Sequence, residues 1–105
     1  MNNIPPKEAQ KIIESGKAVV IDVRTPAEFA DGHIPGARNI NINDSTFAES
    51  MRLLAPDTTY IVNCQSGGRS SRACAFMKDL GLVNVENLEG GFTAWKNAGL
   101  PTENK

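Results

Sequence analysis

The stretch TTYIVNCQSGGRSSRACAFMKDLG, residues 58–81, contains the pattern that decides the fold. It begins with an unbroken apolar run, which is typical of a strand that is covered on both faces of its sheet. Two glycines follow, and apolar side chains then recur at helical spacing before a glycine stop: Ala73, Phe76, Met77 and Leu80. A buried strand, a tight loop and a helix in this order predict one unit of a parallel sheet.

The same alternation continues along the rest of the chain. Strands are predicted over residues 18–22, 39–42, 58–63 and 83–88. Helices are predicted over residues 5–16, 25–30, 43–54, 69–81 and 91–99, and the second of them has a capping box in which Thr25 precedes Pro26 and Glu28. Strands that alternate with helices predict an α/β fold, in which helices cover both faces of a parallel sheet through right-handed crossovers.

Composition limits the function classes that need to be considered. The 105 residues predict a single domain, residues 1–105, that ends in a short polar tail over residues 102–105. The net charge of −1 does not favour nucleic-acid binding, and no apolar run is long enough to predict a membrane span. The N-terminus resembles no secretory signal, so we expect a cytoplasmic location, or a periplasmic one if a signal peptide has been removed. Two cysteines and one histidine predict neither a disulfide scaffold nor a metal site, and we expect no cofactor.

Cys64 is the candidate nucleophile. It lies at the carboxyl end of a predicted strand, where open parallel sheets bind their ligands. Gly67 and Gly68 permit positive φ, so the backbone can turn several N–H groups toward one point at the start of the next helix. Such a concavity binds anions, and the anion in the best position to occupy it is the Cys64 sulfur itself. The pattern therefore predicts a thiolate at neutral pH that needs no histidine.

Other side chains near this loop have defined expectations. The hydroxyls of Ser66, Ser70 and Ser71 are candidate donors, and one of the last two is expected to cap the helix. Arg69 is expected either to bind an oxyanion or to hold the loop in shape. The alternative interpretation of Cys64 is a small buried apolar residue beside an ordinary turn. Cys74 lies inside the helix, where burial is the expected role and a resolving thiol is the alternative.

The sequence resembles the rhodanese family of sulfurtransferases over nearly its whole length. The resemblance is carried by four segments in order: VVIDVRTPAEFADGHIPGARNI, TYIVNC, CQSGGRS and LEGGFTAWKNAGLP. It implies a central parallel five-stranded sheet and a cysteine that carries a sulfane sulfur as a persulfide, from a donor such as thiosulfate or a persulfide to cyanide or a thiol. By position, Cys64 matches the catalytic cysteine, and the substrate-binding loop is expected to comprise Gln65, Ser66, Gly67, Gly68, Arg69 and Ser70.

One feature of the loop departs from the family pattern. Thiosulfate-preferring members often have basic side chains directly after the cysteine, whereas this chain has Gln65 and Ser66. We therefore expect thiosulfate to be a weak or surrogate donor. The expected partners are small sulfur-containing anions, thiols and a sulfur-donor or acceptor protein.

Residues of the first predicted strand and its loop are expected to support the site. Asp22 ends a strand and is expected to hydrogen-bond with loop amides or with Arg24. His33 is expected to stabilise a turn, because a preformed thiolate needs no general base. Phe92 and Trp95 are expected to pack in the core or at the rim of the site.

Two other functions remain open at this stage. Cysteine-dependent phosphatases and arsenate reductases resemble C-x5-R in their loop, but four residues separate Cys64 from Arg69 here. The smaller loop suits a sulfur atom better than a tetrahedral phosphate. A non-catalytic rhodanese-like binding or sensing module is the second alternative, although such modules are usually degenerate at the cysteine.

Overall fold

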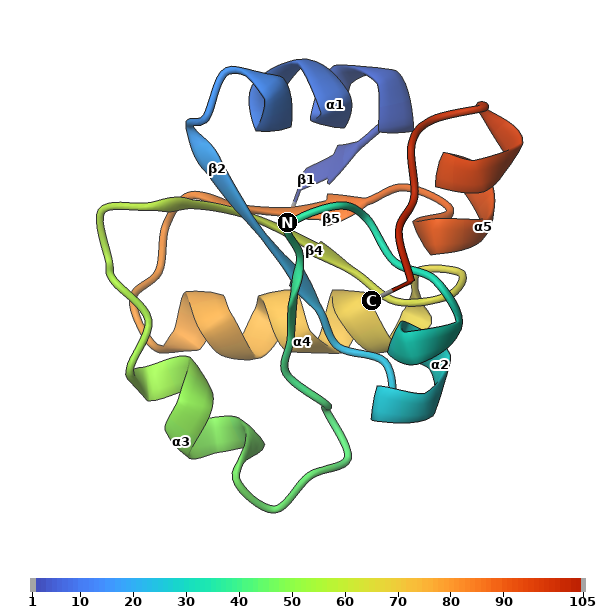
Figure 1. The fold of residues 1–105 in the computed structure, drawn as a ribbon. Coiled ribbons are helices and arrows are strands. Elements are labelled where there is room, and N and C mark those ends of the chain that lie inside the picture. The colour runs from blue at the N-terminus through green and yellow to red at the C-terminus, as the bar shows by residue number, and fades with distance from the viewer. Residues whose placement is uncertain (1, 105) are drawn as a thin grey trace.

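The computed structural model describes residues 2–104, and a five-stranded parallel sheet lies at its centre (Figure 1). The strand order is β1-β5-β4-β2-β3. The strands are β1 (Asn2–Ile4), β2 (Ala18–Asp22), β3 (Arg38–Asn39), β4 (Thr59–Asn63) and β5 (Val85–Leu88). The predicted α/β class is confirmed, and so is the strand number that the resemblance implied.

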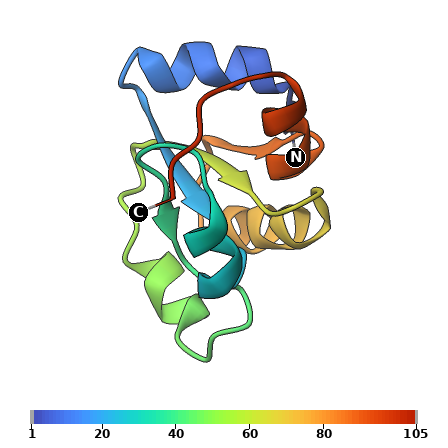
Figure 2. The ribbon, with the colours of Figure 1, turned by 45° about the vertical axis from the view of Figure 1, so that its right-hand side comes forward.

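Helices cover both faces of the sheet (Figures 1 and 2). They are α1 (Pro6–Glu14), α2 (Pro26–Asp31), α3 (Phe47–Arg52), α4 (Gly68–Asp79) and α5 (Gly91–Asn97). Side chains of α1 and α5 form a core cluster with Ile61 on one face, and those of α3 and α4 form a second cluster with Val62 on the other. Adjacent residues of a strand point to opposite faces, which explains why β4 has no polar alternation.

The sequence pattern missed one strand and misplaced another. β1 has three residues, of which only Ile4 is buried, so it offers neither an apolar run nor an alternation to detect. β3 occupies residues 38–39 and not 39–42. Pairing nevertheless continues beyond it, because the amides of Ile40 and Ile42 donate to the carbonyls of Asp22 and Val23. The helix predicted over residues 43–54 is shorter, since α3 begins at Phe47.

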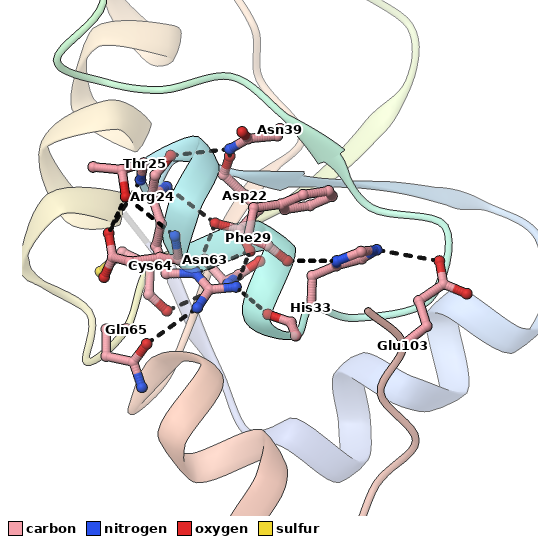
Figure 3. A network of polar contacts seen from close by, with 12 residues as sticks. Asp22, Arg24, Thr25, Phe29, His33, Asn39, Asn63, Cys64, Gln65 and Glu103 are labelled. Carbon is pink, nitrogen blue, oxygen red and sulfur yellow. Dashed lines mark hydrogen bonds and ion pairs between the residues drawn. The ribbon is translucent and has the colours of Figure 1, made fainter. Parts of the chain in front are cut away.

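The segment expected to be a polar tail is bound to the domain at Glu103. The backbones of Glu103 and His33 exchange two hydrogen bonds of 2.8 and 2.9 Å. The His33 ring lies with Nδ1 2.8 Å from the Phe29 carbonyl oxygen and Nε2 3.3 Å from Glu103 Oε2 (Figure 3). The expectation that His33 stabilises a turn is therefore confirmed, and its ring also anchors the C-terminal segment.

The strand register brings the candidate residues to one edge of the sheet. Asp22 pairs with Asn63, so the segments after β2 and β4 leave the sheet at the same level. Val62 pairs with Asn87 on the other side, which places β5 beside the segment that contains Cys64. Within residues 2–104, no helix has the length and apolar character that crossing a membrane requires.

Candidate active site

Cys64 lies between the end of β4 and the first turn of α4. Gly67 has φ +120° and is the N-cap of α4, a conformation that favours glycine. Its N–H donates to Cys64 Sγ at 3.0 Å, and the Ser70 hydroxyl lies 3.4 Å from the same sulfur. The loop therefore turns donors toward Sγ at a helix N-terminus, where the helix dipole also favours negative charge.

The two cysteines are equally buried but ionise differently. Their exposed fractions are 1% for Cys64 and 0% for Cys74, and both are free thiols. Burial raises the pKa of Cys64, but the Ser70 hydroxyl and the amides of Ser70, Gly67 and Ser66 together bring it below the ordinary thiol value. Burial without comparable donors raises the pKa of Cys74 to about 12. The surroundings of Cys64 thus favour a thiolate, and those of Cys74 favour a neutral thiol.

The serines at the start of α4 do not cap the helix as expected. The N-cap is Gly67, which has no side chain that could accept a hydrogen bond from the first turn. Ser70 and Ser71 lie inside the first turn, and both hydroxyls approach the Gly67 carbonyl oxygen, at 3.1 and 2.8 Å. In place of a serine hydroxyl, Cys64 Sγ accepts a hydrogen bond at the start of the helix, from the Gly67 N–H.

Asp22 and Arg24 form a buried ion pair that supports the loop from the side (Figure 3). The Arg24 guanidinium binds both Asp22 oxygens and donates to the Gly32 carbonyl at 2.7 Å. It also donates to Gln65 Oε1 at 3.1 Å and lies 4.5 Å from the centre of the Phe92 ring. The Asp22 carboxylate accepts from the Arg24 side chain and also from the Arg24 backbone amide, and Arg24 in turn holds Gln65.

Gln65 and Ser66 contribute to the loop in different ways. The Gln65 side chain bridges Arg24 and Thr93, since its Nε2 donates to Thr93 Oγ1 at 2.8 Å. Ser66 is exposed, and its backbone amide lowers the pKa of Cys64. Gly68 is exposed and begins α4. The loop residues named from the sequence therefore lie together, but donors reach Sγ from Ser66, Gly67 and Ser70 and not from the Gln65 side chain.

Arg69 is held by Glu28 of α2. Its two terminal nitrogens donate to the two Glu28 oxygens at 2.8 and 2.9 Å. The bond from Arg69 lowers the pKa of Glu28 to about 2, and Glu28 also completes the capping box with Thr25. These bonds tie the start of α4 to α2, and the role of Arg69 toward an oxyanion stays a prediction.

The start of α5 supports the cysteine loop through backbone hydrogen bonds. The sequence did not predict this support. The amides of Phe92 and Thr93 donate to the carbonyls of Cys64 and Gln65 at 2.9 and 3.1 Å. At Gly91, φ is +64° and a Cβ atom would lie 2.6 Å from the Gln65 carbonyl oxygen and 2.7 Å from that of Cys64. The glycine pair in LEGGFTAW was the available signal, because a close backbone approach requires glycine.

Asn87 is a second residue that sequence reasoning missed. It is 4% exposed on β5 and accepts from the Ser70 hydroxyl. The segment VNVENL has polar side chains at three of its six positions, so the sequence contained no signal that singled out Asn87.

A cavity of about 220 Å³ opens beside the loop. Its walls combine charges of both signs with one aromatic face: Arg24, Glu28, Asp31, Gly32, Gln65, Phe92 and Lys96. Within residues 2–104, no three His, Cys, Asp or Glu side chains gather closely enough to hold a metal ion.

This combination of fold and cysteine loop matches proteins of one family. Residues 5–98 match the Rhodanese-like domain. The chain belongs to the rhodanese-like domain family. A relative named thiosulfate sulfurtransferase GlpE, from Pseudomonas fluorescens SBW25, is 40% identical over 89% of this chain and 83% of its own length.

Solved structures of other proteins share the fold. The crystal structure of a rhodanese-related protein from Thermoplasma volcanium has a TM-score of 0.90, with 33% identity over the full length of both chains. A protein from Rhodopseudomonas palustris, described as of unknown function and a possible tyrosine phosphatase, has a TM-score of 0.76. It is 30% identical over 98% of this chain and 85% of its own.

Proposed function

We propose that this rhodanese-like protein is a sulfurtransferase whose nucleophile is the Cys64 thiolate. The observation that carries the proposal is the contrast between two equally buried cysteines. Cys64 receives donors and has a lowered pKa, whereas Cys74 has a pKa of about 12. Relatives named sulfurtransferase, at 36% and 40% identity, support the same activity.

The proposed reaction has two nucleophilic steps. The Cys64 thiolate attacks the outer sulfur of the donor, so that a bond forms between Sγ and this sulfur. The donor's own bond to that sulfur breaks, and its electron pair leaves with sulfite when the donor is thiosulfate, or with a thiolate when the donor is a persulfide. An acceptor thiolate or cyanide then attacks the outer sulfur of the Cys64 persulfide, and Cys64 leaves as the thiolate again.

Main-chain and hydroxyl donors stabilise the negative charge throughout this cycle. The N–H groups of Gly67 and its neighbours already point toward Sγ, so little reorganisation is needed when charge moves to the outer sulfur. Gln65, Arg69 and the Asp22–Arg24 pair keep the loop in this conformation. Because Cys64 is 1% exposed, the donor reaches Sγ only after a local movement of the loop.

The charges around the loop favour a persulfide donor over thiosulfate. Arg24 is paired with Asp22 and Arg69 with Glu28, so neither guanidinium is unpaired and available to a dianion. A persulfide carried by a small thiol or by a donor protein has less charge to neutralise.

The free thiols Cys64 and Cys74 are compatible with a reducing compartment, so we include a cytoplasmic location in the proposal.

Intact-mass measurement tests the proposal directly. The protein is incubated with thiosulfate and, separately, with polysulfide, and its mass is measured before and after cyanide is added. We expect a gain of one sulfur atom that cyanide removes and that is absent from Cys64→Ser, while the circular dichroism of the variant is unchanged. Sulfur loading that persists in Cys64→Ser would show that the nucleophile lies elsewhere.

Phosphate ester hydrolysis is the alternative suggested by one structural neighbour. In a phosphatase of this kind an arginine binds the phosphate, but here Arg69 is occupied by Glu28. Hydrolysis of an aryl phosphate as fast as sulfur transfer would favour that alternative. Binding without any sulfur loading would favour a sensing module.

A further inference from the structure

The Ser70 hydroxyl has one proton and three acceptors within reach. They are the Gly67 carbonyl oxygen at 3.1 Å, Cys64 Sγ at 3.4 Å and Asn87 Oδ1, which is the closest. A hydroxyl donates one hydrogen bond at a time, so these three contacts compete. Ser70 is fully buried, and all three contacts are made to protein atoms.

The Gly67 carbonyl does not decide this competition. Its oxygen already accepts from the Ser71 amide at 3.0 Å and from the Ser71 hydroxyl at 2.8 Å. These two donors use both lone pairs of the oxygen. The Ser70 hydroxyl therefore donates its hydrogen bond either to Asn87 Oδ1 or to Cys64 Sγ.

Hydrogen bonds on its other side fix the orientation of the Asn87 amide. Because the Ser71 proton points to Gly67, Ser71 Oγ acts as an acceptor toward Asn87 Nδ2 at 3.2 Å. The same nitrogen donates to Asn3 Oδ1 on β1 at 3.1 Å. With Nδ2 directed at these two oxygens, Oδ1 has to face Ser70.

We propose that Asn87 is a positioning residue that competes with the Cys64 sulfur for the single hydroxyl proton of Ser70. When Cys64 is a neutral thiol, the Ser70 hydroxyl donates its hydrogen bond to Asn87 Oδ1. When Cys64 ionises, the hydroxyl turns to the sulfur, because a hydrogen bond to a charged acceptor is stronger than one to a neutral acceptor. Buried Asn87 Oδ1 then loses its partner, which has a free-energy cost. Asn87 thus moderates the ionisation of Cys64, and this inference deepens the proposed function, on which it rests.

The other charged groups near Cys64 do not take part in this competition. The charged groups are Arg69 of α4, Glu28 of α2, Asp22 at the end of β2 and Arg24 just after it, and the neutral titratable group is Cys74 of α4. None of them contacts Asn87 in the described residues, and a change at residue 87 leaves their charges in place.

The ionisation of Cys64, followed by the ultraviolet absorbance of the thiolate as a function of pH, tests the proposal without any assay of sulfur transfer. Burial raises the pKa of Cys74 to about 12, so its ionisation is expected to stay separate from that of Cys64. Asn87→Leu removes the competing acceptor and keeps a side chain that branches at the same atom, so we expect the pKa of Cys64 to fall and the thiolate fraction at pH 6 to rise at least about twofold. Ser70→Ala is expected to raise the pKa, and adding Asn87→Leu to Ser70→Ala is expected to change nothing further.

The direction in which the pKa of Cys64 shifts in the Asn87 variants distinguishes competition for the Ser70 proton from a purely structural role of Asn87. Damage to the loop would move the pKa upward toward that of an ordinary thiol, whereas lost competition moves it downward. Asn87→Ala is the second variant, and Asn3→Ala, which leaves Asn87 Oδ1 facing Ser70, is the control. An unchanged or raised pKa in both Asn87 variants, or a fall that persists without Ser70, would overturn the proposal. Failure of sulfur transfer with the expected pKa shifts would instead count against the proposed function.

Discussion

Glu28 holds Arg69 through both carboxylate oxygens, at 2.8 and 2.9 Å, across the face of the cysteine loop. The pair joins α2 to the start of α4, which are 41 residues apart in sequence. The pair keeps the loop in position. At the same time the Glu28 carboxylate neutralises the Arg69 charge, which would otherwise attract an anionic donor. Glu28 therefore affects both the shape and the charge of the site.

The first prediction concerns donor choice. Glu28→Gln keeps the capping box, because glutamine serves at this position, but it removes the charge that neutralises Arg69. We expect kcat/KM for thiosulfate to rise by up to about fivefold, and kcat/KM for a neutral organic trisulfide donor to change little. Asp31→Asn is the matched control, since Asp31 lines the same cavity and no contact joins it to Arg69. Equal increases for both donors would show that Glu28 acts on loop shape alone.

The second prediction concerns stability in acid. The pKa of Glu28 falls from 4.5 to about 2 on folding, so its stabilising contribution is complete above about pH 4.5 and is lost as pH falls toward 2. Glu28→Gln should therefore be less stable than the parent protein at pH 7, by about 0.5 kcal/mol because the pair is partly exposed. Urea unfolding at pH 7, 4 and 2.5 should show this difference shrinking as pH falls. A difference that stays constant over this range would mean that the Glu28 charge contributes nothing.

The third prediction concerns Cys74. Its buried position and its pKa of about 12 make it a packing residue, so Cys74→Ala should form the Cys64 persulfide at the parental rate. The free energy of unfolding should fall by about 1 kcal/mol, because a small buried group is lost. Mass spectrometry after polysulfide treatment checks the first expectation and urea unfolding the second. Slow resolution of the persulfide in this variant would instead indicate a resolving thiol.

The fourth prediction concerns the glycine beneath the loop. Gly91→Ala forces a Cβ into the carbonyls of Cys64 and Gln65 at a positive φ. We expect a loss of about 2–4 kcal/mol in stability and at least about a tenfold loss in sulfur transfer. Gly68→Ala is the control, because nothing lies within 4 Å of its Cβ position and its φ is ordinary. Similar behaviour of the two variants would show that the loop tolerates displacement.

Local patterns predicted the sheet class, the helices on both faces and Cys64 at a strand end, because burial and helix caps leave signals within a few residues. The capping box at Thr25 and the apolar run of β4 are examples. β1 left no such signal, since its place at the edge depends on pairing with β5 more than eighty residues away.

The parts of the site that could not be predicted are contacts between segments distant in sequence. The Glu28–Arg69 pair, the Ser70–Asn87 contact and the support from Gly91 all depend on sheet register. The sequence placed an arginine and two serines near the cysteine. It contained nothing to show that the arginine is already paired or that the hydroxyls of Ser70 and Ser71 lie close to the Gly67 carbonyl.

The support of the loop by α5 also has a consequence for the nascent chain on the ribosome. The carbonyls of Cys64 and Gln65 receive their donors from Phe92 and Thr93, and β1 finds its partner in β5. Neither contact can form until these late segments have been translated. The cysteine loop therefore acquires the supporting contacts described above only after residues 85–93 have been synthesised.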